Sequence, residues 1–148
     1  MPEPSENLGF LVADTARLWR YALDLRLQPL GLSQAKWRVL LQLYREDGMI
    51  QKELAGRLGV EAPTLAVLLD RMSEDGWLMR RESNADRRRK TVHLTTKGQE
   101  VIRQIRATAA HLRRDILAEI PVKDLERCAA VLEQIKEAAV KVSLKDSR

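Results

Sequence analysis

A short basic segment in the middle of the chain constrains its fold more than any other feature. The segment reads Asp86-Arg87-Arg88-Arg89-Lys90-Thr91-Val92-His93-Leu94-Thr95, with one acid followed by four cations. Val92 and Leu94 alternate with polar residues, which predicts a strand, and the stretch 83–86 contains residue types that favour turns. We therefore predict a β-hairpin with arms over about 77–82 and 91–94, whose tip carries the cations.

Positive charge is concentrated around this predicted hairpin. The whole chain carries 26 lysines and arginines against 21 acids, a formal net charge of +5. The segment from Arg80 to Lys90 alone holds six cations against two acids, Glu82 and Asp86. Charge clustered in this way indicates a polyanionic partner, although a solvated charged loop is the simpler alternative. The residues before the hairpin favour the first interpretation.

A helix-turn-helix pattern lies directly before the hairpin. A short helix is predicted over 51–58, Gly59 supplies a left-handed turn, and a second helix runs from about Pro63 to Asp75. The apolar positions that the two helices share are Leu54, Leu58, Val60, Leu65 and Leu68. A helix pair with a glycine turn is common in helical proteins. Followed at once by a basic hairpin, it predicts a winged helix-turn-helix that binds double-stranded DNA.

The second helix of this pair supplies the first group of predicted DNA-contacting residues. Its outward positions include Pro63, Thr64, Val67 and Arg71. Thr64 can bond to a base edge or touch a thymine methyl, whereas Val67 offers only apolar contact. Arg71 can reach a phosphate or a guanine, or it can pair with a neighbouring acid at position 70 or 74. This is a poor set of base readers, so we expect specificity to depend on DNA shape.

The hairpin tip supplies the second group, Asp86, Arg87, Arg88, Arg89 and Lys90. A narrow A·T-rich minor groove concentrates negative potential and attracts an inserted arginine. Asp86 lies two residues before Arg88, so a forked carboxylate–guanidinium pair can hold Arg88 in one pose. Plain turn chemistry is the simpler role of Asp86, and the two roles are compatible. The other three cations are expected to face phosphates.

Amphipathic helices are predicted on both sides of the winged segment, over about 8–30 and 96–142. Apolar residues recur there at three- and four-residue steps, and Pro121 divides the second stretch into two helices. A wide apolar stripe needs a surface to cover it, and the winged segment of about 33–96 is too small to do so. We predict one domain over 1–148, mainly α (α+β), that forms a two-fold homodimer through its helical ends.

Local signals set several helix ends. Ser33 is predicted to cap a helix that stops near Asp47-Gly48, and the following Met49-Ile50 is long enough only for a bridge of strand. Thr96 and Gln99 have the spacing of a capping box, which predicts that Thr96 caps the helix after the hairpin. The last residues, 143–148, are expected to fray.

Several classes of protein lack support in the sequence. No apolar run is long enough to cross a bilayer, and the first 30 residues lack the apolar stretch of a signal peptide. We expect a cytoplasmic, nucleoid-associated protein with no membrane partner. The chain has no Walker loop, dinucleotide fingerprint or nucleophile motif, so we expect neither an enzyme nor a cofactor.

Isolated histidines and one cysteine give no metal site. His93 and His111 lie far apart in the sequence, and Cys128 is the single cysteine. Cys128 falls on the apolar seam of the last helix, so we expect it to be a small buried residue. The alternative is a redox-sensing thiol in a small-molecule or redox sensor whose DNA contact is weak or vestigial.

The chain resembles the MarR family of bacterial transcription regulators, and within it the SlyA branch. Wings of that family follow the pattern Asp-x-Arg-x-x-x-Val/Ile-x-Leu-Thr, which is matched by Asp86, Arg88, Val92, Leu94 and Thr95. The resemblance extends from about Leu8 to Val142 and includes the SlyA-like segments 16–20, 27–30, 32–34 with Trp37, 61–65 and 86–88. Val67 departs from the branch, which usually carries an arginine there, so a different operator preference is expected.

The resemblance implies a homodimer that binds near-palindromic operators and represses or activates promoters. The first, fifth and sixth helices would dimerise, the recognition helices would enter successive major grooves, and the wing arginines would enter the flanking minor grooves. Many members also bind small aromatic carboxylates between the dimer helices and the winged domain. Arg17 and Trp37 match residues implicated in that pocket, and a guanidinium and an indole suit a carboxylate and a ring. Core packing is the alternative role of Trp37.

Overall fold

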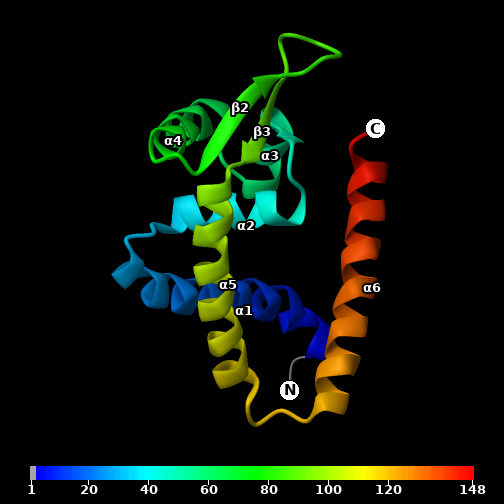
Figure 1. Cartoon of the computed structure of the whole chain (residues 1–148). Helices are drawn as coiled ribbons and strands as arrows, with labels where there is room; N and C mark the ends of the chain where they lie inside the picture. Colours follow the sequence, from blue (N-terminus) through cyan, green and yellow to red (C-terminus); the bar gives the residue numbers. More distant parts are fainter. Residues whose placement is uncertain (1–2) are drawn as a thin grey trace. The chain divides into compact units, whose positions relative to one another are not determined.

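Helices dominate the structure, which is a computed structural model that describes residues 3–148 (Figure 1). The elements in chain order are α1 (Pro4–Leu27), the 3-10 helix η1 (Gln28–Leu30), α2 (Gln34–Arg45), β1 (Met49–Ile50), α3 (Gln51–Leu58), α4 (Ala62–Glu74), β2 (Leu78–Glu82), β3 (Lys90–Leu94), α5 (Thr96–Leu117) and α6 (Val122–Asp146). A helix pair, α3 and α4, is followed by the β2–β3 hairpin, which is the order of a winged helix-turn-helix. The predicted fold class is confirmed.

Three helix ends differ from the predicted ones. Helix α1 begins at Pro4, because proline fits the first turn of a helix and nothing after it interrupts the helix. Helix α6 continues to Asp146 instead of fraying after Val142, because no helix-breaking residue lies in between. Helix α5 is capped by Thr95 rather than Thr96: the Thr95 Oγ1 atom accepts the backbone N–H of Gly98 at 3.1 Å.

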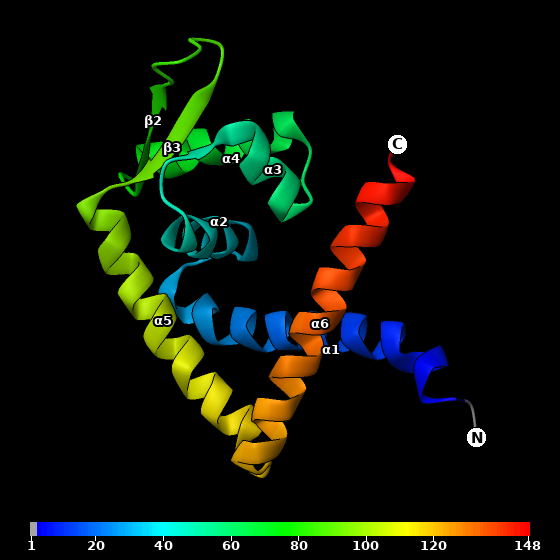
Figure 2. The ribbon, with the colours of Figure 1, turned by 90° about the vertical axis from the view of Figure 1, so that its right-hand side faces the viewer.

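The sheet is a small antiparallel one with the strand order β1-β3-β2. In the hairpin Leu78 pairs with Leu94 and Glu82 pairs with Lys90, while β1 adds Met49 opposite Val92. The chain between the paired ends of β2 and β3 forms the tip. This tip extends beyond α3 and α4, on the side away from α1 (Figures 1 and 2).

A single apolar core holds α2, α3, α4 and the hairpin together. Ser33 caps α2 as predicted, its Oγ accepting the Lys36 N–H at 3.3 Å, and Gly59 ends α3 with a φ of 66° that favours glycine. The buried apolar residues are Leu23, Leu27, Leu32, Trp37, Val39, Leu40, Leu43, Met49, Leu54, Ala55, Leu58, Leu65, Leu69, Met72, Leu78, Val92, Ile102, Ile105 and Leu112. Burial of these side chains stabilises the unit by about 1.5–3 kcal/mol for each large one.

The chain divides into two compact units. The first, which we call the winged unit, ends at Leu112, and the second covers Arg113–Arg148. The first unit exceeds the predicted winged core of 33–96, because Leu23 and Leu27 of α1 and Ile102 and Ile105 of α5 are buried in the same apolar core. The second unit contains α6, on which no residue is buried.

Uncovered apolar side chains are numerous on the terminal helices. On α1 they are Leu8, Phe10, Leu11, Val12, Leu18, Tyr21 and Leu25, and on α6 they are Val122, Val131, Leu132, Ile135, Val140, Val142 and Leu144. Exposed apolar side chains in such numbers on one helix usually mark an interaction site. Within residues 3–148, no helix has both the length and the apolar character needed to cross a membrane.

Candidate nucleic-acid interface

The outward face of α4 presents the residues that the sequence selected for contact with bases. Leu65, Leu69 and Met72 are completely buried and anchor the helix to the core. The other face is open: Pro63, Thr64, Val67 and Arg71 are all exposed, Val67 to 54%. The helix therefore offers one hydroxyl, two apolar contacts and one guanidinium to a partner that approaches from this side.

An ion pair between α4 and the hairpin takes up the acid next to Arg71. Asp70 pairs with Arg80 of β2, whose side chain is only 23% exposed. Asp70 is therefore occupied, and Arg71 makes no ion pair among residues 3–148. The sequence left pairing of Arg71 with Asp70 open because helical neighbours are the nearest acids in the chain, whereas the actual partner of Asp70 comes from a different element.

The wing tip is ordered by its one acid. The Asp86 Oδ1 atom accepts the backbone N–H of Arg88 at 3.0 Å, and Oδ2 lies 4.0 Å from Nε of Arg89. The role of Asp86 in the turn is therefore present, as expected for an aspartate that bonds its own backbone two residues on. Among residues 3–148 the guanidinium that Asp86 contacts is that of Arg89, and no ion pair joins Asp86 to the Arg88 guanidinium.

The cations at the tip are exposed. Arg87, Arg88 and Lys90 have no carboxylate partner in the described part of the chain, and Arg89 has only the long contact to Asp86. The backbone of the tip is closed by Ser83 N–H donating to the carbonyl of Arg89 at 2.8 Å. Free guanidinium and ammonium groups on a closed turn can bind phosphates without first breaking internal ion pairs.

A groove between the tip and the start of α3 adds residues that the sequence analysis missed. Its volume is about 870 Å³, and its lining residues are Ile50, Gln51, Lys52, Glu53, Ala62, Arg88, Arg89 and Lys90. Four of these side chains are cations and one is an acid. The first N–H groups of α3 also lack a side-chain cap, so they leave partial positive charge beside the groove.

Lys52 is the functional candidate that this groove adds. It is exposed in the first turn of α3 and shares the groove with Arg88 and Lys90, which lie on the hairpin. The sequence carries little signal for it, because one lysine at a helix start is common and the hairpin residues are almost forty positions away. A polyanion in the groove would meet cations from both elements.

The two predicted ligand-binding residues have different environments. Trp37 is 4% exposed, lies in the core, and donates from Nε1 to Oδ1 of Asp24 at 3.3 Å. Arg17 is exposed on α1 and lies 3.6 Å from Asp14. No contact joins Arg17 to Trp37 in the described chain. The burial of Trp37 favours its alternative role in core packing.

Cys128 and the histidines form no evident centre. The Cys128 thiol is exposed, so the predicted burial is not met within a single chain. His93 is half-buried and its Nε2 atom lies 2.8 Å from Oγ1 of Thr91. The described residues include no group of three or more His, Cys, Asp or Glu side chains placed to hold a metal ion.

Known proteins share both the sequence pattern and this architecture. A model of the MarR family matches residues 32–90, from the residue before the α2 cap to the start of β3. The solved structure of transcriptional regulator PA3341 is 45% identical, with a TM-score of 0.80 over 90% of this chain and 98% of that one.

Two less similar structures have the same fold. A MarR transcriptional regulator from Methanosarcina mazei Go1 is 23% identical, with a TM-score of 0.81 over 93% of this chain and 99% of that one. CouR from Rhodococcus jostii RHA1, solved with p-coumaroyl-CoA bound, is 23% identical, with a TM-score of 0.73 over 91% of this chain and 95% of that one.

Proposed function

The chain belongs to the MarR family of transcriptional regulators, and from this premise we propose that it controls transcription by binding double-stranded DNA as a homodimer. Members of the family are regulators rather than enzymes. One observation carries the proposal: α4 and the hairpin tip lie at the same end of the winged unit (Figure 2), and both the outward residues of α4 and the tip cations are exposed. A duplex at that end meets a helix and a cationic ribbon together.

Each part of this end has its own role in the proposed complex. Thr64 and Val67 enter the major groove with the first half of α4, where Pro63 sets the first turn, and Arg71 follows in the second half of the helix. Arg87 and Arg88 reach the adjacent minor groove or its phosphates, and Asp86 shapes the tip that carries them. The DNA backbone between these contacts passes the groove beside Lys52. Since α4 offers few polar readers, DNA shape supplies much of the specificity.

A second copy of the chain is the proposed cover for the terminal helices. Helix α6 has no buried residue, and α1 buries only Leu23 and Leu27. An isolated chain would leave this apolar surface in water, whereas a two-fold dimer covers equivalent patches on both copies. Two winged units related by a two-fold axis fit a near-palindromic operator with half-sites one helical turn apart.

A small aromatic carboxylate is the proposed effector, acting on a cytoplasmic regulator at the nucleoid. CouR shows that one protein of this fold has been solved with an aromatic acid thioester bound. In this chain the exposed Arg17 guanidinium is the proposed carboxylate partner, while the buried Trp37 would contribute only after the core around it opens. Membership of the SlyA-like branch remains a prediction, and so does the binding of salicylate-type ligands. Titration with such a ligand, followed by tryptophan fluorescence in the wild type and in Arg17→Ala, tests the binding.

Selection from random duplexes tests the proposed function directly. The purified wild-type protein should enrich a near-palindrome of about 20 base pairs, counting two half-sites and their flanks. The affinity for that operator should fall steeply and log-linearly with salt, because several phosphate contacts release counterions. A protein that enriches no sequence at low salt does not have this function.

The exposed thiol of Cys128 favours one alternative function, a redox sensor with vestigial DNA contact. Oxidation of an exposed thiol on α6 would then change the protein with or without DNA. Cys128→Ser separates the two functions. If peroxide changes operator binding equally in the wild type and in this variant, the sensor is excluded. If the wild type enriches no specific duplex, and Cys128→Ser abolishes a peroxide-dependent change in its oligomeric state, the sensor is supported.

A further inference from the structure

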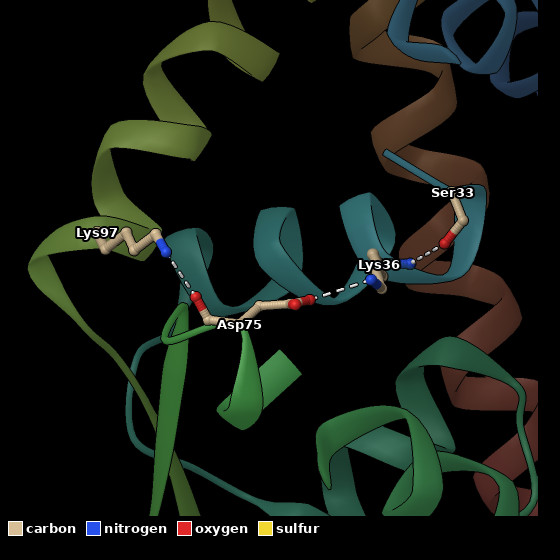
Figure 3. Close-up of polar contacts among 4 residues, drawn as sticks. All are labelled: Ser33, Lys36, Asp75 and Lys97. Carbon is tan, nitrogen blue, oxygen red and sulfur yellow. Dashed lines mark hydrogen bonds and ion pairs between the residues drawn. The ribbon is translucent and has the colours of Figure 1, made fainter. Parts of the chain in front are cut away.

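The C-terminal end of α4 is fastened to two other helices through one residue (Figure 3). Asp75 follows α4, and its Oδ2 atom accepts from Nζ of Lys36 on α2 at 3.0 Å. The backbone oxygen of Asp75 accepts from Nζ of Lys97 on α5 at 2.9 Å. Two ammonium groups therefore meet the helix end where the backbone carbonyls carry partial negative charge.

The residues after Asp75 are fastened to the start of α5 as well. Thr95 donates from its backbone N–H to the Trp77 carbonyl at 3.1 Å and from Oγ1 to the Gly76 carbonyl at 2.5 Å. Lys36 also lies over the Trp77 ring, 5.2 Å from its centroid. We call this cluster the α4 joint; it consists of Lys36, Asp75, Gly76, Trp77, Thr95 and Lys97.

The other end of α4 lacks polar contacts of this kind, and among its first four residues only the apolar side chain of Leu65 packs into the core. Ala62, Pro63 and Thr64 are exposed, and the helix has no side-chain cap at its start. Helix α4 has 13 residues and is therefore about 20 Å long. A tilt of about 5° at the joint moves the first turn by roughly 1–2 Å, which is enough to misplace a hydrogen bond to a base edge.

The ion pair in the joint is well placed to set this angle. The side chains of Lys36 and Asp75 are only 24% and 39% exposed, so water screens the pair less than it screens a pair on an open surface. The pair also joins residues 39 positions apart, on α2 and at the end of α4. Because α2 packs into the apolar core, the ion pair ties the end of α4 to that core.

We propose that Asp75 is a positioning residue for DNA recognition, whose side chain acts through Lys36 to set how α4 enters the major groove, at a helix end that Lys97 also holds through the backbone carbonyl. This inference rests on the proposed function and names a residue that touches no DNA. Asp75 connects the recognition helix to α5, and α5 is the helix that continues past Leu112 out of the winged unit. The joint thus fixes α4 with respect to the helix that leads toward the proposed dimer contacts.

Asp75→Asn and Lys36→Met test the inference in the full-length protein. The operator is the duplex of about 30 base pairs that the wild type enriches from a random library, and the comparison is an unrelated duplex of the same length. We expect each variant to lower the ratio of operator affinity to unrelated-duplex affinity by about tenfold. The affinity for the unrelated duplex and its salt slope should not change, because no phosphate contact is lost.

Three further variants make the test specific to the pair. The double variant should lose no more than either single variant, because both changes remove the same contact. Lys36→Arg keeps the charge and should restore most of the ratio. Glu46→Gln breaks the exposed pair of Glu46 with Arg57, 3.0 Å apart, and serves as the matched control with no change in the ratio.

The outcomes separate this inference from the function beneath it. An unchanged affinity ratio in both Asp75→Asn and Lys36→Met, with or without a lower melting temperature, shows that the joint is only structural and overturns the inference. A parallel loss on both duplexes overturns it too, because positioning affects only the specific complex. Failure of the wild type to enrich any duplex would instead overturn the proposed function and the inference with it.

Discussion

The charge at the wing tip is divided unequally among its cations. Arg89 shares the Asp86 carboxylate, whereas Arg88 has no acidic partner in the described chain. Arg88→Ala should weaken operator binding by about 1–3 kcal/mol and reduce the salt slope by about 1, since one phosphate or groove contact is lost. Titration at several salt concentrations measures both quantities.

The control for Arg88→Ala removes the same charge elsewhere. Arg20 is exposed on α1, and this helix lies at the end of the winged unit away from the tip (Figure 1). Arg20→Ala should lower operator affinity only by the small amount expected from the loss of one positive charge away from the tip. Equal losses in the two variants would mean that overall charge, and not the wing, determines the affinity.

Lys52 should behave as a pure phosphate contact. It lines the groove beside Arg88 and Lys90 and has no acidic partner among residues 3–148. Lys52→Ala should weaken binding to the operator and to an unrelated duplex by the same factor, and reduce both salt slopes by about 1. A loss restricted to the operator would contradict a phosphate contact and indicate that Lys52 reads bases.

For single residues, the sequence predicts side-chain partners that are local in the chain better than partners that lie on another element. Turn and cap chemistry is local, so Ser33 and Asp86 could be assigned to a cap and a turn from the sequence. The pair of Asp70 with Arg80 joins a helix to a strand and depends on how closely the two pack. The sequence left pairing of Asp70 with Arg71 of the same helix open, and the fold pairs Asp70 with Arg80 instead.

Among the elements, α5 was predicted to begin one residue late, and the reason lies outside the helix. Thr95 and Thr96 are equally good caps as residue types. The fold selects Thr95 because its backbone N–H and Oγ1 also reach the carbonyls of Trp77 and Gly76. That choice depends on the end of α4 and the start of β2, so no local pattern contains it.

Close packing at the start of α5 gives a prediction about helical glycines. A Cβ atom at Gly98 would collide with the carbonyl oxygen of Trp77, whereas a Cβ at Gly56 of α3 would meet nothing within 4 Å. Gly98→Ala should therefore lower the free energy of unfolding by about 1–3 kcal/mol. Gly56→Ala should raise it by about 0.5–1 kcal/mol, because alanine favours a helix.

Urea denaturation at one fixed protein concentration measures both glycine variants, since the stability of a dimer depends on concentration. The opposite signs are the test. If Gly98→Ala proves neutral, then α5 and β2 are not as close as the structure places them, and the α4 joint loses one of its supports.

For the whole molecule, the sequence predicted an unsatisfied apolar surface but not where the winged unit ends. The periodicity of the terminal helices showed that each has an apolar stripe, and α6 indeed buries none of it. The sequence could not show that the first unit extends to Leu112, because Ile102 and Ile105 have the same spacing as the later apolar residues of the helix. Periodicity shows that a face is apolar and does not identify what covers it.

The proposed dimer follows from this surface and can be broken on α6. Leu132 is 44% exposed in the single chain, so Leu132→Asp should not disturb the fold of the chain itself. In a two-fold dimer both copies lose an apolar contact of about 1.5–3 kcal/mol, which raises the dimer dissociation constant by at least about 100-fold. Operator affinity should fall with it, because each monomer keeps only one half-site.

Gln134→Asp adds the same charge two residues away, on the other side of the helix, and should leave the dimer intact. Sedimentation equilibrium decides the matter: a monomeric wild type, or identical masses for the two variants, would contradict a dimer formed through α6.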